Sequence, residues 1–145
     1  MLSNEFPIHR SVRQGCPLLP ILFNLFINDI LNNCDKYGVS IGNKKCCGGI
    51  FADGIVLIAS SERKMKALLR YVFCWTNKNK ISFGINECAT MVIKPFNFVS
   101  YPVYEDPTFH LVMYSIPKKS VYIYLGIPFS NVSPLSLLSL IWYWS

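Results

Sequence analysis

Two apolar segments joined through Ala-Asp-Gly constrain the fold of this chain more than any other feature. Residues 50–59 read IFADGIVLIA, and the segments around Asp53 and Gly54 are rich in the β-branched residues that favour strands. An Asp-Gly pair between such segments is a strong signal of a β-hairpin, because glycine accepts the positive φ that a type I′ turn requires. Taken alone, the pattern predicts a tight hairpin in which Asp53 and Gly54 form an ordinary turn.

The residues after this hairpin predict a strongly amphipathic helix. Ser60 or Ser61 can cap its N-terminus, and Glu62 follows in the first turn, where a negative charge complements the helix dipole. Basic side chains lie mostly on one face of the predicted helix. Apolar side chains recur at helical spacing on the other face: Met65, Leu68, Leu69, Val72 and Trp75. Residues 77–80 end the helix.

A second helix is predicted from near Pro17 to about residue 31. Pro17 and Pro20 fit its first turn, where the missing N–H is harmless. Its apolar side chains are expected to turn mostly inward. Short strands are predicted at residues 39–41, 81–85, 90–93, 110–114 and 121–125. The order of these elements predicts an α+β fold with a short antiparallel sheet and the two main helices on one face.

Length and composition set broad limits on the class of protein. A chain of 145 residues makes one ordinary domain. The formal net charge of +6 arises from scarce acidic residues and suits a polyanionic partner without requiring one. Six scattered cysteines show no zinc-ligand spacing, so we expect free thiols and a reducing, intracellular location. No apolar stretch reaches the roughly 20 residues of a membrane span, so no membrane partner is expected.

Four blocks in a fixed order resemble the reverse transcriptases of retrotransposons without long terminal repeats. The segment SVRQGCPLLPILFNLFINDI at 11–30 resembles the block in which Arg-Gln-Gly-Cys-Pro leads into a helix. IFADGIVLIAS resembles the catalytic hairpin of that family, and CWTNKNKISFGINECATMVI at 74–93 is similar to the helix end and strand that follow it. YIYLGIPF at 122–129 resembles the Tyr-Leu-Gly strand of the primer grip.

The resemblance implies a polymerase palm and assigns roles to particular residues. Asp53 would be the catalytic residue and the ligand of magnesium, which activates the primer hydroxyl and clamps the triphosphate. Arg13, Gln14, Gly15 and Phe51 would contact the nucleotide or template, with Gly15 allowing close approach to the nascent base pair. For Arg13 and Gln14 an ordinary polar loop is the alternative. Tyr124, Leu125 and Gly126 would support the primer backbone.

Three departures from the family pattern make activity of this fragment unexpected. The second carboxylate of the hairpin falls on Gly54, which has no side chain to bind a metal ion. The family places another metal-binding aspartate on a strand well before Arg13, but the only acid in the preceding residues is Glu5. We therefore expect the fingers and the first palm strand to be missing. The family also commonly has a lysine before the threonine that corresponds to Thr90, where this chain has Ala89.

The sequence therefore predicts residues 8–130 to be a partial reverse transcriptase palm and residues 131–145 to be an apolar tail, the start of a truncated thumb. Its leading interpretation is an inactive fragment of an RNA-directed DNA polymerase, with an RNA template and a DNA primer as the implied partners and magnesium as the implied cofactor. Two alternatives remain open at this point. One is a non-catalytic nucleic-acid-binding module, and the other is a retrotransposon relic without selected function.

Overall fold

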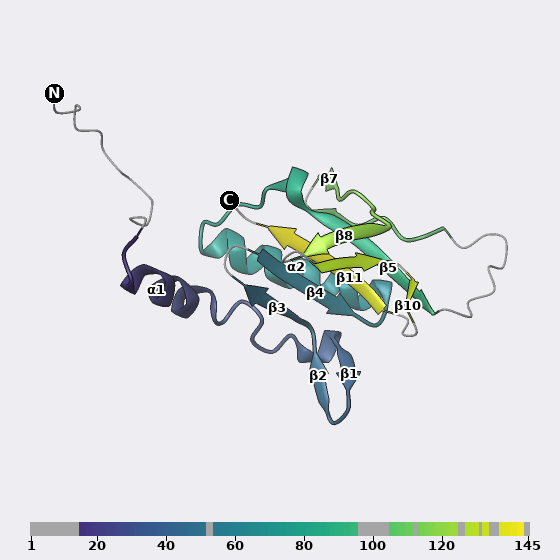
Figure 1. Cartoon of the computed structure of the whole chain (residues 1–145), viewed down its shortest axis with the longest axis horizontal. Helices are drawn as coiled ribbons and strands as arrows, with labels where there is room; N and C mark the ends of the chain where they lie inside the picture. The colour runs from purple at the N-terminus through teal and green to yellow at the C-terminus, as the bar shows by residue number, and fades with distance from the viewer. Residues whose placement is uncertain are drawn as a thin grey trace.

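The fold is a mixed α+β arrangement in which one long helix packs against a five-stranded sheet (Figure 1). The computed structural model describes residues 15–51, 54–95, 105–111, 113–124, 127–130, 132–133 and 137–143. Its helices are α1 (Leu18–Ile27) and α2 (Glu62–Lys78), with short 3-10 turns η1 (Asp35–Tyr37) and η2 (Ile85–Glu87). Its strands are β1 (Val39–Ile41), β2 (Lys44–Cys46), β3 (Gly48–Phe51), β4 (Gly54–Ala59), β5 (Ala89–Pro95), β6 (His110–Leu111), β7 (Tyr114–Ser115), β8 (Val121–Tyr124), β9 (Ile127–Ser130), β10 (Val132–Ser133) and β11 (Leu137–Tyr143).

The main sheet has the strand order β10-β5-β11-β4-β3. Its pairs are antiparallel except for β10 and β5, which run parallel. Three separate two-stranded ribbons join β1 to β2, β6 to β7, and β8 to β9. The short antiparallel sheet predicted from the sequence is therefore present, whereas its identity as a polymerase palm stays a prediction.

The C-terminal segment contributes the central strand of this sheet. Leu138 to Tyr143 pair in register with Ala59 to Gly54 of β4, and Leu137 to Ile141 pair with Ile93 to Ala89 of β5. The backbone of β11 therefore finds hydrogen-bonding partners on both edges, which an exposed apolar tail would lack. The sequence pattern placed this segment outside the palm. Its assignment as the start of a thumb stays a prediction.

Helix α2 forms as its sequence predicts. The Ser61 side chain caps it by accepting a hydrogen bond from the Lys64 backbone N–H at 3.3 Å. The predicted apolar face is buried at Met65, Leu68, Leu69 and Val72, and Trp75 is the exception because it is only half-buried. This face packs against the fully buried side chains of β4, which are Ile55, Leu57 and Ala59. The contact forms the centre of the hydrophobic core.

Helix α1 begins after Pro17 as predicted, but its apolar side chains do not turn inward. Leu18, Leu22 and Leu25 are 57%, 47% and 67% exposed, and of the helix residues Ile27 is buried. The reason is visible in Figure 1, where α1 projects away from the sheet and approaches the rest of the fold with its C-terminal end. The prediction that both helices cover one face of the sheet thus fits α2, whereas α1 does not lie along the sheet.

Two predicted strands differ from the observed elements. Residues 81–84 are irregular and Ile85 begins η2, although Ile81 and Phe83 are half-buried against the core. Their alternating apolar pattern therefore provides core contacts without sheet pairing. The strand predicted at 110–114 is instead split between β6 and β7, which pair with each other. The chain folds back there because Phe109 and Ile116 are both buried and the Ile116 N–H donates to the Phe109 carbonyl at 2.9 Å.

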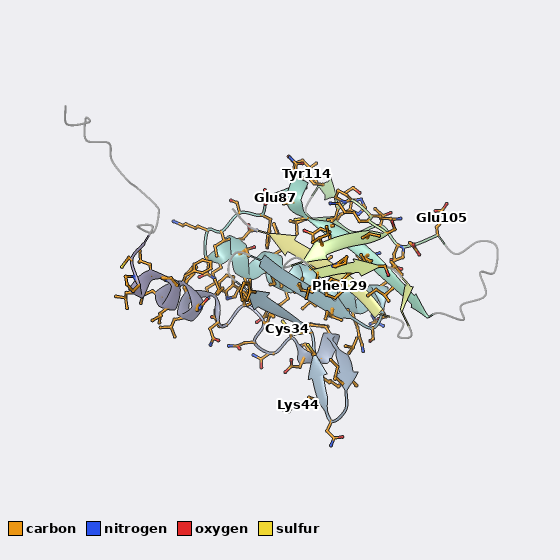
Figure 2. The ribbon with its side chains drawn as sticks, viewed as in Figure 1. Cys34, Lys44, Glu87, Glu105, Tyr114 and Phe129 are labelled. Carbon is orange, nitrogen blue, oxygen red and sulfur yellow. The ribbon has the colours of Figure 1, made fainter. Side chains whose placement is uncertain are left out.

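All six cysteines lie in the described part of the chain and are free thiols. Cys34, labelled in Figure 2, is buried with Cys47 in the core. Burial raises the pKa of the Cys34 thiol to about 11 and that of Cys47 to about 12. The core therefore favours the neutral form of both thiols.

We predict that this preference makes the fold sensitive to alkali. Because both folded-state pKa values lie above the ordinary value of 9.0, the stabilisation is complete below about pH 9 and is lost as the pH rises toward 11 and 12. Denaturant titrations at increasing pH should show a falling free energy of unfolding. Replacing Cys34 and Cys47 by alanine should flatten this dependence, whereas Cys74→Ala, at an exposed thiol, should leave it unchanged. An equal dependence in all three proteins would contradict the prediction.

A second prediction concerns the close approach of β3 to β4. Gly48 has a φ of +150°, and a Cβ at this position would lie 2.0 Å from the Val56 carbonyl oxygen, whereas a Cβ at Gly49 would meet nothing within 4 Å. Gly48→Ala should therefore destabilise the chain by about 2 kcal/mol or more, since backbone strain and a backbone clash combine. Gly49→Ala is the matched control and should keep the melting temperature. Equal melting temperatures for the two variants would show that β4 can move away from β3.

Candidate functional site

The β3–β4 hairpin places Gly54 inside the sheet rather than at the turn. Phe51 pairs with Gly54 and Ile50 pairs with Ile55, so the connection between the strands is residues 52 and 53. Asp53, the predicted catalytic and metal-binding residue, lies outside the described residues. The prediction of a turn centred on the Asp53-Gly54 pair is wrong by one position, because Gly54 is already the first residue of β4. The hairpin itself is confirmed.

The position of Gly54 determines where a carboxylate would lie if this residue were an aspartate. Gly54 is buried and has a strand on each side, since it pairs with Phe51 of β3 and Tyr143 of β11. Side chains alternate between the faces of a strand, and Ile55 is directed to α2 and the core. A side chain at position 54 would therefore be on the opposite face, which is the face that Phe51 shares. Because Gly54 has no side chain, it supplies no metal-ligating oxygen on that face.

Phe51 lies on the surface, with 60% of its area exposed. Residues that face each other across an antiparallel pair have their side chains on the same side of the sheet. The Phe51 ring is therefore next to the Cα of Gly54, close to where β3 ends. This placement is compatible with the predicted contact to nucleotide or primer, which stays a prediction.

Of the predicted binding residues before α1, Gly15 is described and Arg13 and Gln14 are outside the described residues. Gly15 has a φ of +87°, and no atom lies within 4 Å of the place where a Cβ would be. A backbone in this conformation favours glycine, so the local geometry explains the residue without any crowding. Gly15 precedes the end of α1 that is far from the sheet in Figure 1. The structure therefore does not bring Gly15 next to Phe51.

Of the predicted primer-grip residues, Tyr124 is in the described part of the chain. Tyr124 is the last residue of β8 and pairs with Ile127, whereas Leu125 and Gly126 are outside the described residues. The segment that leads into β8 is attached to β5, because the Thr90 N–H donates to the Pro117 carbonyl at 2.8 Å and the Lys119 N–H donates to the Thr90 carbonyl at 2.9 Å. These hydrogen bonds attach the segment that leads into the β8–β9 ribbon to the main sheet.

Lys119 and Tyr122 form a contact at this ribbon that the sequence analysis did not predict. The Lys119 ammonium lies over the Tyr122 ring, 5.1 Å from its centroid. The Tyr122 hydroxyl donates to the Glu87 carbonyl at 3.4 Å. A cation over an aromatic ring depends on the fold of the connecting chain, and the spacing of the two residues alone does not indicate it.

The described residues do not provide a site for the magnesium ion that the resemblance implies. Carboxylate oxygens are the ligands that magnesium prefers, and Gly54 supplies none. Among the described ranges, no three or more His, Cys, Asp or Glu side chains lie together in a group that could hold a metal ion. In the same ranges, no helix combines the length and apolar character needed to cross a membrane.

The block that precedes the hairpin in sequence is joined to α2 by a polar and an aromatic contact. Asp29 follows α1, and its Oδ1 accepts a hydrogen bond from the Trp75 indole N–H at 3.1 Å. The Phe26 and Trp75 rings pack with centroids 5.8 Å apart. Trp75 is half-buried at the edge of the core, where it makes both of these contacts. The position of α1 therefore depends on residues at the C-terminal half of α2.

Comparison with known proteins identifies the family. The profile of the family described as reverse transcriptase (RNA-dependent DNA polymerase) matches residues 2–129. The chain belongs to this family. It therefore belongs to a class whose substrates are nucleic acids and whose chemistry generally depends on divalent metal ions.

Two curated relatives are both Pol polyproteins of retrotransposable elements. One is a retrovirus-related Pol polyprotein from a type-2 retrotransposable element of Drosophila melanogaster, which is 31% identical over 132 residues, covering 88% of this chain and 12% of the relative. The other is a retrovirus-related Pol polyprotein from a type-1 retrotransposable element of Nasonia vitripennis, which is 30% identical over 87 residues, covering 59% of this chain and 8% of the relative. No solved structure matches the chain significantly. The chain thus corresponds to a small part of these relatives.

The Asp29 contact leads to a prediction about how α1 is held. Asp29→Ala should destabilise the chain by about 1 kcal/mol, because the hydrogen bond involves a charged acceptor but is exposed to solvent. Trp75→Phe removes the indole N–H and keeps a ring for Phe26. In a double-mutant cycle measured by denaturant unfolding, the two changes should cost less together than the sum of the single changes. Strict additivity would show that the hydrogen bond contributes nothing.

Proposed function

We propose that this chain is the palm segment of a retrotransposon reverse transcriptase, from the Arg-Gln-Gly block to the primer grip, and that the 145-residue polypeptide by itself does not catalyse nucleotidyl transfer. The profile match over residues 2–129 supports the palm assignment. The observation that carries the inactivity is Gly54, which pairs with Phe51 in the sheet. By the resemblance, Gly54 corresponds to the second hairpin carboxylate of the family. Residues 131–145 would then begin the region that follows the palm.

The chemistry gives the physical reason for inactivity. Polymerisation by this class uses metal ions held by carboxylates that converge from different strands, and the ions stabilise both the attacking and the leaving oxygen. Asp53 is the one carboxylate of the hairpin. Losing the carboxylate at Gly54 removes one negative charge from the place where positive metal ions would gather. In the proposed function, a partner or a longer polypeptide would have to supply the missing ligands.

The proposed nucleic-acid partners follow from the family and the predicted contacts. Arg13, Gln14 and Gly15 would contact template and nucleotide, and Phe51 would lie beneath the primer end. Tyr124, Leu125 and Gly126 would support the primer backbone. These roles are assigned by the resemblance and are supported by the surface position of Phe51 and by the attachment of the β8 ribbon to β5.

Primer extension tests the proposal directly. With a primed RNA template and magnesium or manganese, the purified polypeptide should show no template-dependent incorporation above background. Gly54→Asp should also remain inactive, because it restores a second carboxylate to the same hairpin but none from another strand. Incorporation by the natural chain that disappears in Asp53→Ala would overturn the proposal.

Metal affinity tests the role of position 54 in the hairpin without requiring catalysis. Gly54→Asp should bind manganese more tightly than the natural chain, because two neighbouring carboxylates then share the ion. Gly49→Asp is the matched control, since Gly49 lies in the same hairpin, pairs with Val56 and has open space beside it. Equal manganese affinity of the two variants would show that position 54 is not at a metal site.

A further inference from the structure

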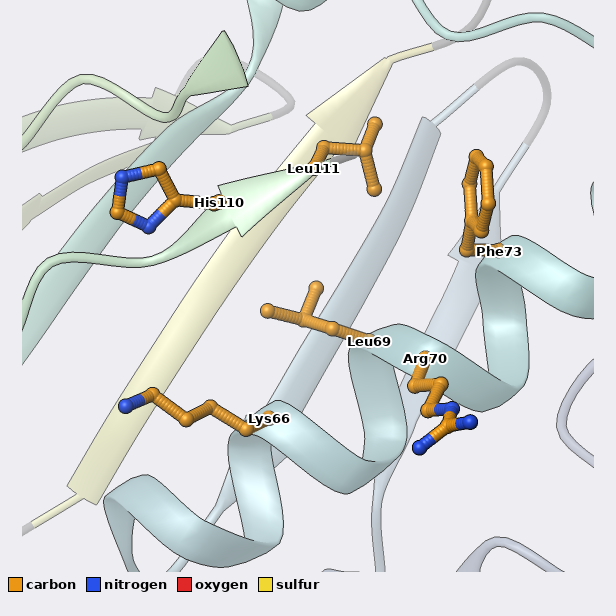
Figure 3. Close-up of a pocket in the computed structure, with 6 residues that line it drawn as sticks. All are labelled: Lys66, Leu69, Arg70, Phe73, His110 and Leu111. Carbon is orange, nitrogen blue, oxygen red and sulfur yellow. The ribbon is translucent and has the colours of Figure 1, made fainter. Parts of the chain in front are cut away.

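A cavity of about 300 Å³ lies between α2 and β6, on a part of the molecule that the proposed function does not use (Figure 3). Among the described residues it is lined by four positions of α2 and two of β6, namely Lys66, Leu69, Arg70, Phe73, His110 and Leu111. None of these residues belongs to the β3–β4 hairpin or to the β8–β9 ribbon. The cavity is therefore separate from the candidate polymerase residues.

The lining combines an apolar floor with a basic rim. Leu69 and Leu111 are each 4% exposed, and Phe73 is half-buried beside them. In Figure 3 the Lys66 ammonium and the His110 ring lie on one side of Leu69, while the Arg70 guanidinium lies on the other side. A small inorganic anion would leave the floor uncovered, and a neutral apolar ligand would leave the rim unused. The fitting ligand has a flat apolar part and an attached negative charge.

The basic residues of the rim continue along the helix. Arg63, Lys66 and Arg70 follow one another at spacings of three and four residues, which places them on one stripe of α2. The stripe extends over about 10 Å, so it can meet more than one phosphate of a strand. This continuity favours a single-stranded nucleic acid over an isolated nucleotide, because successive phosphates then find successive cations.

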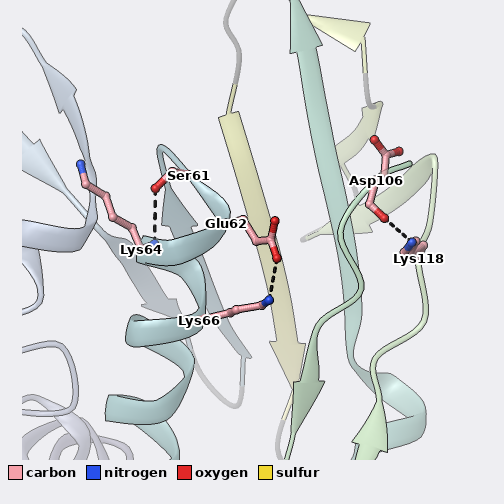
Figure 4. Close-up of polar contacts among 6 residues, drawn as sticks. All are labelled: Ser61, Glu62, Lys64, Lys66, Asp106 and Lys118. Atoms are coloured by element: carbon pink, nitrogen blue, oxygen red, sulfur yellow. Dashed lines mark hydrogen bonds and ion pairs between the residues drawn. The ribbon is translucent and has the colours of Figure 1, made fainter. Parts of the chain in front are cut away.

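One acidic residue competes for this rim. Glu62 pairs with the Lys66 ammonium at 2.6 Å, as drawn in Figure 4. Their side chains are 41% and 58% exposed, and a solvent-exposed pair of this kind contributes less than about 1 kcal/mol. A phosphate with its own negative charge can therefore replace Glu62 at small cost. Arg63 and Arg70 make no ion pair with any residue in the described ranges.

We propose that this cavity is a binding site for single-stranded nucleic acid, with one base on the apolar floor of Leu69, Phe73 and Leu111 and the adjoining phosphates on Lys66 and Arg70. Bases of any identity have an aromatic face, so the stacking part tolerates many sequences. His110 would add a donor to the rim, on the same side of Leu69 as Lys66. The inference is independent of the proposed function, since it requires no metal ion and no triphosphate.

Binding of a labelled oligouridylate of about ten nucleotides tests the site. Fluorescence anisotropy in the presence of a chelator should show binding that weakens as salt rises. The double variant Lys66→Gln, Arg70→Gln should bind roughly tenfold more weakly at about 0.1 M salt, and its salt slope should fall by about 0.7 for each cation removed. All four substituted side chains in the test and control proteins are exposed in the structure, and circular dichroism checks that the fold is retained.

The matched control also removes two positive charges, but from strand β2, away from the cavity. Lys44→Gln, Lys45→Gln changes two exposed lysines of β2, and Lys44 lies at the far end of the β1–β2 ribbon in Figure 2. This control should keep most of the affinity. Equal losses in the two double variants would overturn the proposal, because binding would then depend on net charge alone. The absence of binding by the natural chain at low salt would overturn it as well.

Crosslinking locates the base. An oligonucleotide with iodouracil should form adducts on the peptides that contain Phe73 or His110 after irradiation, and the Lys66→Gln, Arg70→Gln variant should lose them. Adducts confined to the β3–β4 hairpin or the β8–β9 ribbon would overturn the proposal. So would an acidic, aromatic-rich peptide that binds the natural chain more tightly than the oligonucleotide and displaces it.

Discussion

The packing of α2 on β4 is the contact on which the rest of the fold depends. Leu68 and Val72 are fully buried on the helix, and Ile55 and Leu57 are fully buried on the strand. Truncating a buried leucine in such a contact commonly costs about 2–5 kcal/mol, a large share of the stability of a small domain. The neighbouring elements are attached to these two elements. Strands β3 and β11 pair with the two edges of β4, and α1 is held through Trp75 of α2.

This arrangement explains how the hairpin keeps its shape with a glycine at position 54. The register between β3 and β4 is determined by buried residues along the strand and by the close approach at Gly48, none of which requires a carboxylate at position 54. Gly54 fits the strand between Phe51 and Tyr143. Membership of the reverse transcriptase family and the proposed loss of catalysis are therefore compatible within one fold.

Local sequence patterns were reliable where the burial of a segment followed from its own periodicity. The cap at Ser61 and the buried face of α2 were predicted because helical spacing assigns a whole face to the core at once. The same reasoning failed for α1, whose residues Leu18 and Leu25 are exposed, because an apolar stripe does not say whether a partner lies against it. The strand prediction for residues 81–85 failed for a related reason: an alternating apolar pattern does not require sheet pairing. Phe83 contacts the core although its backbone is irregular.

The sequence by itself determined the family and the hairpin, because the four blocks, their order and the apolar segments around Asp53 can be read along the chain. Only the tertiary structure decided that residues 137–143 form the strand between β4 and β5, and that His110 lines one cavity with Lys66 and Arg70. Strand pairing and cavities join residues that are far apart in sequence. Their geometry depends on which surfaces remain uncovered after α2 has packed on β4, and local periodicity does not contain that information.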